Sequence, residues 1–305
     1  MLHLIVNREA QSKKSSKIWP TAERMLAGSR IPHRIHVTAC KGDASVISRE
    51  ISETDPSPSI AVIGGDGTIH EVLSGLSSLS AVTLGVIPQG SGNDFARGMG
   101  LLKDPEEAIK AILEPKEIVP MDIGCLKSRE GARRFGVSTG IGFDAAVCHE
   151  VDRSGLKTLL NRFGAGKLTY SIVAAKEIAG SDPGTMRVRV DGEKCYSFPK
   201  AYFAAVMNQP YEGGGLMLCP SASACDGLLD LFVCADMPRT ELVTALPFTM
   251  YGLHRRHAGV HFMRGRHFEI FAEQKSRIHL DGEAGELTHT MDVSLEKEKL
   301  RVIVR

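Results

Sequence analysis

Two glycine-rich stretches carry residues suited to phosphate chemistry. The first, GGDGT (Gly64–Thr68), follows the apolar run SIAVI (Ser59–Ile63), which is typical of a strand buried on both faces. Apolar residues then recur at helical spacing from Ile69 to Leu76. The glycines therefore lie on a predicted strand-to-helix turn, where backbone N–H groups and the positive end of a helix can bind an anion such as phosphate.

Asp66 stands inside this turn. A carboxylate repels a neighbouring phosphate unless a metal ion or a proton-donating substrate lies between them. Glycine alone leaves a second interpretation open, a tight turn without a ligand, because glycine-rich strand-helix junctions are common. The aspartate favours the phosphate site.

The second stretch, PQGSGND, follows the predicted strand Ala81–Pro88. Loops at the carboxyl ends of neighbouring parallel strands meet at one crevice, so the two stretches are expected to line a single nucleotide site. Ser91 places a hydroxyl between two glycines. Asn93 and Asp94 are expected to cap the next helix, and capping alone would also explain their presence.

Length and composition restrict the class of protein. A chain of 305 residues predicts two domains, and 43% hydrophobic with 24% charged residues is ordinary for a globular protein. A net charge of +1 gives no overall attraction to nucleic acid or to an anionic membrane. The sequence has no apolar run of transmembrane length and no secretory signal pattern, which predicts a cytoplasmic protein. Seven scattered cysteines without a CxxC pair favour reduced thiols.

Strands and helices alternate in the first part of the chain, which predicts a parallel sheet. The predicted strands are Leu2–Val6, Arg34–Thr38, Ser59–Ile63 and Ala81–Pro88. The predicted helices are Ile18–Leu26, Ala44–Ile51 with Asp43 as its cap, the helix after GGDGT, and Asp104–Leu113 with Asp104 as its cap.

After about Pro120 the pattern changes to many strands and two helices, which predicts a largely antiparallel second domain. The predicted strands are Phe135–Gly142, Met186–Val190, Tyr202–Met207, Leu228–Val233, His267–Phe271, Arg277–Leu280 and Leu300–Val304. The predicted helices are Leu156–Ile178 and Arg239–Leu253.

The triplet DGE occurs twice, at Asp191–Glu193 and Asp281–Glu283. Asp-Gly is a common hairpin turn, so a purely structural role is open for both copies. The basic stretch Gly252–His267 also has two interpretations, contact with anionic lipid or ordinary solvated surface.

The order of the motifs resembles a known family. GGDGT followed by PQGSGNDFAR is similar to the catalytic domain of diacylglycerol kinases, which is shared with sphingosine and ceramide kinases and the bacterial lipid kinases. VTACKGDA, MDIG, STGIGFDA, CDGLLDL and LDGE match in the same order, so the resemblance spans Val37 to Glu283.

The resemblance implies an α/β nucleotide-binding domain (residues 1–121 plus 292–305) and an antiparallel β-sandwich domain for the lipid (residues 122–291), with the active site in the cleft between them. It implies that ATP is the co-substrate. The residues implied to bind ATP are Thr38, Gly64, Gly65, Asp66, Gly67, Thr68, Ile69, His70, Gly90, Ser91, Gly92, Asn93 and Asp94.

The resemblance also implies two uses of Mg²⁺, a cation that prefers oxygen ligands and retained waters. Asp66, Asp94 and Asp122 would form an acidic network that organises the catalytic ion through water. A second, structural ion would be bound by the Asp226 side chain and by main-chain oxygens of Ser223 and Leu228.

For the chemical step, the resemblance implies that Glu283 is the general base on the lipid hydroxyl, with Asp281 as the alternative. Asp66 would belong to the same catalytic set. The other triplet, Asp191–Glu193, matches no family motif and is interpreted as a structural turn.

The expected function is Mg²⁺-dependent transfer of the ATP γ-phosphate to diacylglycerol or a similar long-chain lipid alcohol. The expected partner is a membrane lipid at the inner face of the membrane, with no nucleic acid, and a homodimer is expected from the resemblance. Two alternatives are NAD kinase, which also uses GGDGT, and a non-catalytic lipid- or nucleotide-binding regulator. The regulator would be favoured if the departures from the family pattern at Asn7–Lys14 and His70 disable catalysis.

Overall fold

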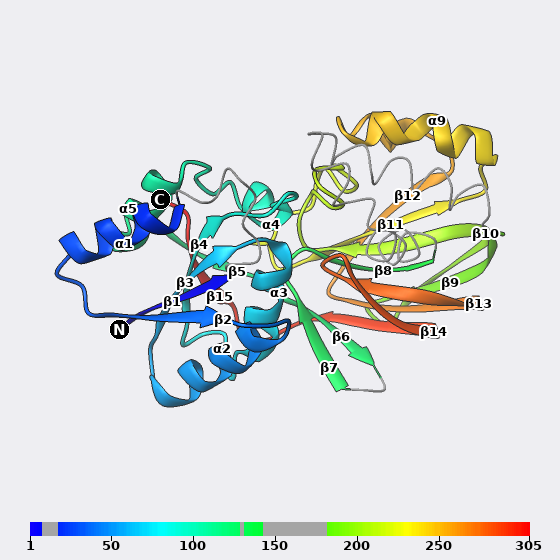
Figure 1. Cartoon of the computed structure of the whole chain (residues 1–305). Coiled ribbons are helices and arrows are strands. Elements are labelled where there is room, and N and C mark those ends of the chain that lie inside the picture. The colour runs from blue at the N-terminus through cyan, green and yellow to red at the C-terminus, as the bar shows by residue number, and fades with distance from the viewer. Residues whose placement is uncertain (8–17, 129–130, 143–181) are drawn as a thin grey trace. The chain divides into compact units, whose positions relative to one another are not determined.

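The computed structural model describes residues 1–7, 18–128, 131–142 and 182–305 (Figure 1). The chain divides into two compact units. Unit 1 comprises Met1–Ile123 and Glu296–Arg305, and unit 2 comprises Gly124–Leu295. The predicted helix Leu156–Ile178 lies outside the described residues, as does the segment Asn7–Lys14 after its first residue.

Unit 1 contains a six-stranded sheet in the order β2-β1-β3-β4-β15-β5. All neighbouring pairs are parallel except β15 and β5. The strands are β1 (Leu2–Asn7), β2 (His33–Thr38), β3 (Ser59–Gly64), β4 (Thr83–Pro88), β5 (Ile118–Met121) and β15 (Leu300–Ile303). β1, β3 and β4 are buried along almost their whole length, which explains their continuous apolar sequences.

Helices cover both faces of this sheet (Figure 1). They are α1 (Ile18–Gly28), α2 (Asp43–Thr54), α3 (Asp66–Gly75), α4 (Asp94–Gly98) and α5 (Pro105–Leu113). α1 and α5 pack in one core with side chains of β1, β3 and β4, whereas α2 packs against α3. α5 begins as predicted, because Asp104 accepts a hydrogen bond from the Glu107 N–H at 3.0 Å and Pro105 is the first helical residue.

The predicted cap at Asp43 is wrong. α2 begins at Asp43 itself, after Gly42 in a left-handed conformation. The Asp43 carboxylate instead accepts the upstream N–H groups of Ala39 and Cys40 at 2.7 and 3.0 Å, and these bonds lower its pKa. The side-chain carboxylate of an aspartate can accept N–H groups of residues before it or after it in the chain. The sequence alone therefore does not decide which N–H groups Asp43 accepts.

The C-terminal segment is fixed to unit 1 by Glu298. Its Oε2 accepts the N–H groups of Leu79 and Ser80 at 2.8 and 3.0 Å and the Ser78 hydroxyl at 3.0 Å. These bonds lower the pKa of Glu298. The last strand, β15, thereby completes the sheet that begins at the N-terminus.

Unit 2 contains a nine-stranded sheet in the order β12-β11-β10-β8-β13-β14-β6-β7, with β9 paired to β10 and β13. All its pairs are antiparallel. The strands are β6 (Gly124–Ser128), β7 (Gly131–Phe135), β8 (Ser138–Gly142), β9 (Gly184–Val190), β10 (Lys194–Met207), β11 (Leu229–Ala235), β12 (Val260–Gly265), β13 (His267–Leu280) and β14 (Glu283–Leu295).

β10 is buried on both faces near its end. Ala204 and Val206 lie in one hydrophobic cluster, and Phe203, Ala205 and Met207 lie in another. The alternation is that of a strand, whose successive side chains point to opposite faces. Helix α9 (Arg239–Thr249) contributes Leu242 to the second cluster, which places α9 over this side of the sheet (Figure 1).

Several predicted elements of unit 2 have different bounds in the structure. The predicted strand Phe135–Gly142 is divided between β7 and β8, and the two predicted strands of His267–Leu280 are one continuous strand, β13. The predicted helix Arg239–Leu253 ends at Thr249 and is followed by a short 3-10 helix, η2 (Leu253–Arg256). β6, β12 and β14 were not predicted at all.

The predicted fold class is confirmed: an N-terminal α/β unit is followed by a β-rich unit. None of the helices in the described ranges combines the length and the hydropathy that a membrane span requires.

Candidate active site

The two glycine stretches of unit 1 lie in contact with each other. β3 and β4 are parallel neighbours, and the Gln89 N–H donates to the Gly64 carbonyl at 2.8 Å. A Cβ atom added to Gly65 would lie 2.9 Å from the Gly90 Cα, and one added to Gly90 would lie 2.8 Å from the Gly65 Cα. Only glycine allows these two backbones to approach so closely. The convergence expected from parallel strands is present.

Asp66 connects the two loops. Its Oδ1 accepts the Phe95 N–H at 3.1 Å, so a residue at the start of α3 satisfies an N–H at the start of α4. Asn93, which was expected to cap α4, instead bonds to both the N–H and the carbonyl of Gly90 at 2.8 Å each. Asn93 has a φ of 52°, a conformation that asparagine tolerates better than most residues. The cap on α4 therefore comes from the first loop.

Exposure divides the residues predicted to bind ATP into two groups. Gly65, Gly67 and Thr38 are partly exposed, and Ser91 is exposed. The side chains of Thr68, Ile69 and His70 are buried. At the N-terminal end of α3, the exposed atoms are thus mostly backbone atoms. Backbone N–H groups are the groups that bind phosphate at a helix N-terminus.

The end of β1 is hydrogen-bonded to the turn between β3 and α3. The Asn7 side-chain amide donates to the Thr68 hydroxyl at 3.0 Å, and the Thr38 hydroxyl donates to the Val6 carbonyl at 3.4 Å. Thr38, the turn at Thr68 and the end of β1 therefore lie together at the carboxyl ends of the parallel strands.

Two of the three carboxylates predicted to organise the catalytic Mg²⁺ have protein cations as partners. Asp94 forms an ion pair with Arg97, which also donates to the Gly92 carbonyl at 2.8 Å. Buried Asp122 lies 2.8 Å from the Lys299 Nζ. Within the part of the chain that the structure describes, no group of three or more His, Cys, Asp or Glu side chains is arranged to hold a metal ion. The carboxylates have the oxygen donors that Mg²⁺ prefers, but Asp94 and Asp122 already form ion pairs with Arg97 and Lys299.

In unit 2, Asp281 and Glu283 lie at the turn between β13 and β14. Asp281 Oδ2 accepts the Gly136 N–H at 3.0 Å, and Oδ1 accepts the N–H groups of Val137 and Ser138 at 2.7 and 3.1 Å. Both carboxylate oxygens of Asp281 therefore hold the segment that leads into β8. Glu283, two residues later, is partly exposed.

Sequence reasoning missed the side chains that support this turn. Asn208 and Gln209 each donate to the Gly136 carbonyl at 3.0 Å, on the segment that Asp281 also holds. Buried Glu212 and His279 face each other, with 3.1 Å between Oε1 and Nε2. The one available signal was a pair of amide residues directly after the apolar strand β10.

Comparison with known proteins identifies the family. Residues 1–126 match the family model described as "Diacylglycerol kinase catalytic domain", and residues 137–304 match "YegS C-terminal NAD kinase beta sandwich-like domain". The second match covers more than half of the chain. The chain belongs to the diacylglycerol kinase and YegS-like family of lipid kinases. The predicted resemblance is confirmed, and the protein is a kinase, that is, a phosphotransferase.

Individual relatives agree with this assignment. The lipid kinase is 32% identical to a protein of Chromohalobacter salexigens named "Probable lipid kinase YegS-like", over 82% of this chain and 76% of the relative. It is 29% identical to a diacylglycerol kinase of Bacillus subtilis over 82% of this chain and 78% of the relative. A crystal structure of a diacylglycerol kinase from Bacillus anthracis shares the fold, with a TM-score of 0.73 at 21% identity, over 100% of this chain and 96% of the other.

The lipid kinase has a different cation at the predicted structural Mg²⁺ site. Asp226 accepts the Leu228 N–H at 3.1 Å through Oδ1 and forms an ion pair with Arg264 through Oδ2. Arg264 also bonds to buried Asp230 at 3.3 Å. Burial raises the pKa of Asp230, and Arg264 opposes that shift. The Asp226 carboxylate, the one side-chain ligand of the predicted site that includes Ser223 and Leu228, is thus paired with a guanidinium rather than open to a metal ion.

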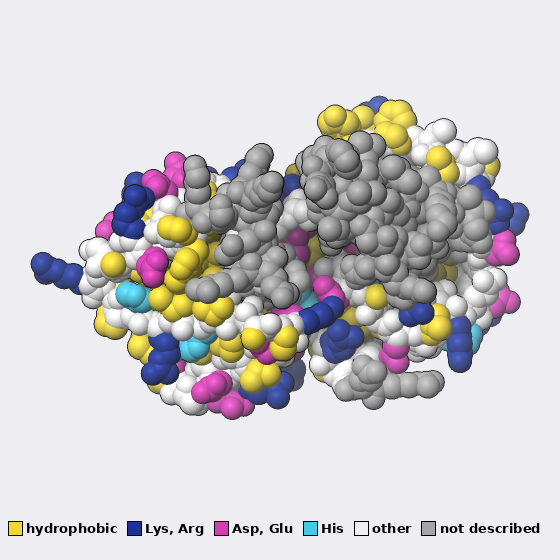
Figure 2. Space-filling model, viewed as in Figure 1, with side chains coloured by type: hydrophobic (Ala, Val, Ile, Leu, Met, Phe, Trp, Pro, Cys, Tyr) yellow, Lys and Arg dark blue, Asp and Glu magenta, His cyan; other side chains and the backbone are white. Residues whose placement is uncertain are grey.

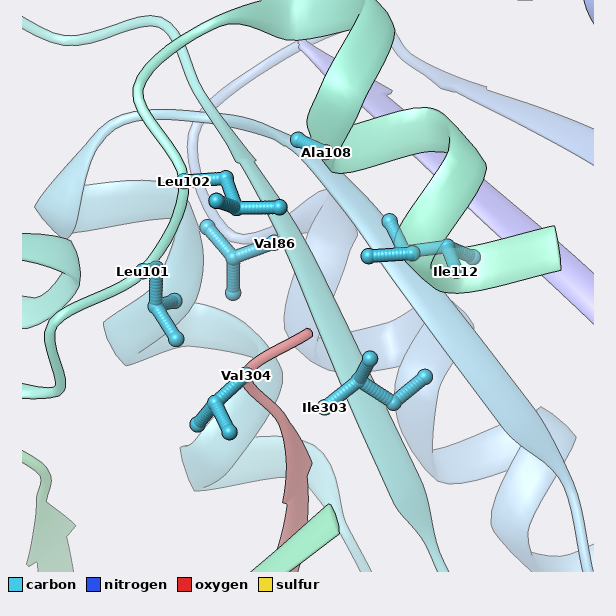
Figure 3. Close-up of a pocket in the computed structure, with 8 residues that line it drawn as sticks. Val86, Leu101, Leu102, Ala108, Ile112, Ile303 and Val304 are labelled. Atoms are coloured by element: carbon cyan, nitrogen blue, oxygen red, sulfur yellow. The ribbon is translucent and has the colours of Figure 1, made fainter. Parts of the chain in front are cut away.

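An apolar pocket of unit 1 carries no chemistry (Figure 3). It is formed by β4, α5, β15 and the segment after α4. Its lining residues are Val86, Leu101, Leu102, Ala108, Ala111, Ile112, Ile303 and Val304. Because none of these side chains is polar or charged, they offer no group for proton transfer.

Proposed function

We propose that this lipid kinase transfers the γ-phosphate of Mg·ATP to the hydroxyl of diacylglycerol or a similar long-chain lipid alcohol. One observation carries the proposal: the contact between Gly65 and Gly90 at the N-terminal end of α3. The relatives named as diacylglycerol and lipid kinases support the choice of acceptor.

Unit 1 supplies the nucleotide-binding groups in this proposal. The β3–α3 and β4–α4 loops present backbone N–H groups to the phosphates, and the exposed Ser91 adds a hydroxyl. Mg²⁺ enters as part of the substrate, bound to the ATP phosphates, because Asp94 and Asp122 already have protein cations as partners. The metal would neutralise charge on the transferring group.

Asp66 is a positioning residue in this proposal. Its bond to the Phe95 N–H fixes the second loop relative to the first. Phosphoryl transfer depends mainly on alignment of the reactants, so loss of this bond reduces the rate even if ATP still binds.

Glu283 is the proposed general base. Both oxygens of Asp281 accept backbone N–H groups, so Asp281 is suited to hold the turn rather than to take a proton. Glu283 removes the proton of the lipid hydroxyl, the hydroxyl oxygen forms a bond to the γ-phosphorus, and the bond to ADP breaks. The products are the phosphorylated lipid, ADP and a proton.

Labelled phosphate transfer tests the proposal. Purified protein receives [γ-³²P]ATP, Mg²⁺ and, in separate reactions, micelles of diacylglycerol, micelles of a sphingoid base, or NAD. We expect label in a lipid and a decrease of about 100-fold in kcat/KM for Asp66→Ala, which removes the acceptor of the Phe95 N–H. Asp43→Ala is the matched control, because Asp43 also lies at the start of a helix of unit 1 and accepts backbone N–H groups.

Label in NAD would contradict the proposal and indicate the NAD kinase alternative. Absence of label in every acceptor would contradict it in favour of a non-catalytic binding protein.

A further inference from the structure

Helix α9 is apolar on two sides. Leu242, Ala245 and Thr249 are buried and recur at spacings of three and four residues, which defines the face packed on unit 2. Apolar side chains of α9 and of the turn after it are exposed as well. These exposed apolar side chains are Val243, Phe248, Met250, Tyr251 and Leu253. Together with the exposed Arg255 and Arg256, they form a surface that we call the apolar-basic face.

The apolar-basic face is not a frayed end of the chain. Tyr251 is 74% exposed and Phe248 is 50% exposed, yet the backbone between them is anchored. The Met217 N–H donates to the Thr249 carbonyl at 2.8 Å, and the buried His254 ring bonds to the Leu218 carbonyl at 2.9 Å. The exposed side chains are thus presented from a fixed backbone.

Close packing at Gly252 strengthens this anchoring. Gly252 has a φ of 66°, and a Cβ atom there would lie 2.7 Å from a side-chain atom of Pro220. Burial alternates along the turn: Gly252 and His254 are buried, whereas Leu253 and Arg255 are exposed. The sequence after α9 thereby directs its apolar and basic side chains to the outside.

Hydrophobic side chains gather over α9 in the space-filling view (Figure 2). From Val243 to Arg256 the sequence contains no acidic residue, and Arg255 and Arg256 are both exposed. Glu241 lies just before this stretch and pairs with His257 at 3.1 Å. Among the described residues, neither Arg255 nor Arg256 forms an ion pair with an acidic side chain. Exposed aromatic and aliphatic side chains beside exposed arginines are the composition of surfaces that bind at the lipid headgroup level.

We propose that the apolar-basic face docks on an anionic lipid surface. The inference rests on the proposed function, because a long-chain lipid alcohol resides in a bilayer and the enzyme must reach it there. Charge favours this occupant over a second copy of the chain, since a two-fold symmetric contact centred on the face would bring the arginine pair of each copy toward that of the other. An anionic headgroup layer satisfies the arginines while the apolar side chains enter the boundary of the acyl region.

Vesicle cosedimentation without nucleotide tests the proposal. The vesicles are pure phosphatidylcholine, or phosphatidylcholine mixed with phosphatidylglycerol. We expect the full chain to bind the mixed vesicles at least about tenfold more tightly than the neutral ones. Salt screens the attraction between each arginine and the anionic headgroups, so two to three basic contacts together give roughly a tenfold increase in affinity. Phe248→Ser/Tyr251→Ser/Leu253→Ser should weaken binding to mixed vesicles by at least about tenfold. Arg255→Gln/Arg256→Gln should remove the preference for the anionic lipid.

Two control variants match these changes elsewhere in the molecule. Val46→Ser/Leu287→Ser removes exposed apolar side chains from other surfaces, and Arg133→Gln/Arg134→Gln makes the same change in net charge on β7. Both controls should bind mixed vesicles as the unchanged protein does. Thermal unfolding of all variants establishes that they fold, and sedimentation velocity reports their oligomeric state.

The proposal is overturned if the unchanged protein binds neither vesicle, if the variants of the face bind as tightly as the controls, or if those variants only convert a dimer to a monomer. Turnover of a water-soluble short-chain diacylglycerol, measured without vesicles, separates this proposal from the proposed function. Variants of the face should keep that turnover. If the unchanged protein lacks it but binds mixed vesicles through the face, the proposed function fails and the docking surface stands.

Discussion

The triplet Asp-Gly-Glu occurs twice in unit 2, and the two copies fold into the same turn in different surroundings. In Asp191–Glu193 and in Asp281–Glu283, the aspartate has a φ near 50° and the glycine a φ of 75° or 84°. Each aspartate also exchanges hydrogen bonds with a neighbouring strand. The Asp191 N–H donates to the His267 carbonyl and the Asp281 N–H to the Ser138 carbonyl, both at 2.9 Å.

The carboxylates differ in how they are used. Asp191 accepts the Arg266 and His267 N–H groups through one oxygen, at 2.8 and 2.9 Å. Asp281 accepts three N–H groups through both of its oxygens. The side chain two residues before each aspartate differs as well. Arg189 pairs with Glu269 at 3.1 Å with both side chains about half exposed, whereas His279 pairs with Glu212 at the same distance with 0% and 6% exposure.

The comparison teaches that a short motif specifies a turn, and that buried partners decide what the turn can do. Both triplets form the hairpin that Asp-Gly favours. Among the described residues, a buried polar pair and the amides of Asn208 and Gln209 support the second turn, whereas the pair beside the first turn is exposed. A rigid support of this kind is what a proton-transferring side chain requires.

The largest expected difference in stability concerns the two glutamates that pair beside the turns. Glu212→Ala should lower the free energy of unfolding by about 3–5 kcal/mol, because it removes one partner of a buried pair. Glu269→Ala should lower it by less than about 1 kcal/mol, because its pair with Arg189 is exposed to solvent. Urea unfolding followed by circular dichroism measures both, and equal losses would remove the distinction between the two surroundings.

Asparagine at each aspartate gives the next largest effect. Asp281→Asn leaves an amide nitrogen facing an N–H donor, so the free energy of unfolding should fall by about 1.5–3 kcal/mol. Asp191→Asn keeps a carbonyl oxygen for both of its N–H donors and should cost less than about 1 kcal/mol. The same unfolding measurement decides, and a larger loss for Asp191→Asn would reverse the comparison.

Alanine at the two glycines should have a smaller effect, equal in both turns. Gly192→Ala and Gly282→Ala should each cost about 1–2 kcal/mol, because both glycines have positive φ and neither meets another atom within 4 Å of an added Cβ. Gly28→Ala is the control, since Gly28 has the same open space but no positive φ. Thermal unfolding should show equal decreases for the first two variants and none for the third. Unequal decreases would mean that the turns differ locally.

Sequence patterns predicted the elements whose apolar residues are regularly spaced. β3, α3 and α5 follow their apolar periodicity and, for α5, the Asp104 cap. β14 was missed because it is partly exposed along most of its length and contains Gly285, so its sequence lacks a clear alternation. Its position is determined by pairing with β13, which is a tertiary effect.

The candidate site was predictable in its residue types and not in its pairings. Gly65 and Gly90 lie in contact because they follow β3 and β4, which are parallel neighbours and end at the same edge of the sheet. The partners of the carboxylates were not readable, because Lys299 and Arg264 lie far along the chain from Asp122 and Asp226. Such pairs depend on the folded arrangement of the strands and have no local signature.

The most direct test of the account is kcat for diacylglycerol phosphorylation with glutamine at the last residue of each triplet. Glu283→Gln should lower kcat by about 10²–10⁴-fold, the usual contribution of a general base, while the free energy of unfolding changes by less than about 0.5 kcal/mol. Glu193→Gln, which makes the same change in the exposed copy, should leave kcat within about twofold. A Glu283→Gln enzyme with unchanged kcat, or an equal loss in both variants, would contradict the assignment of Glu283 as the base.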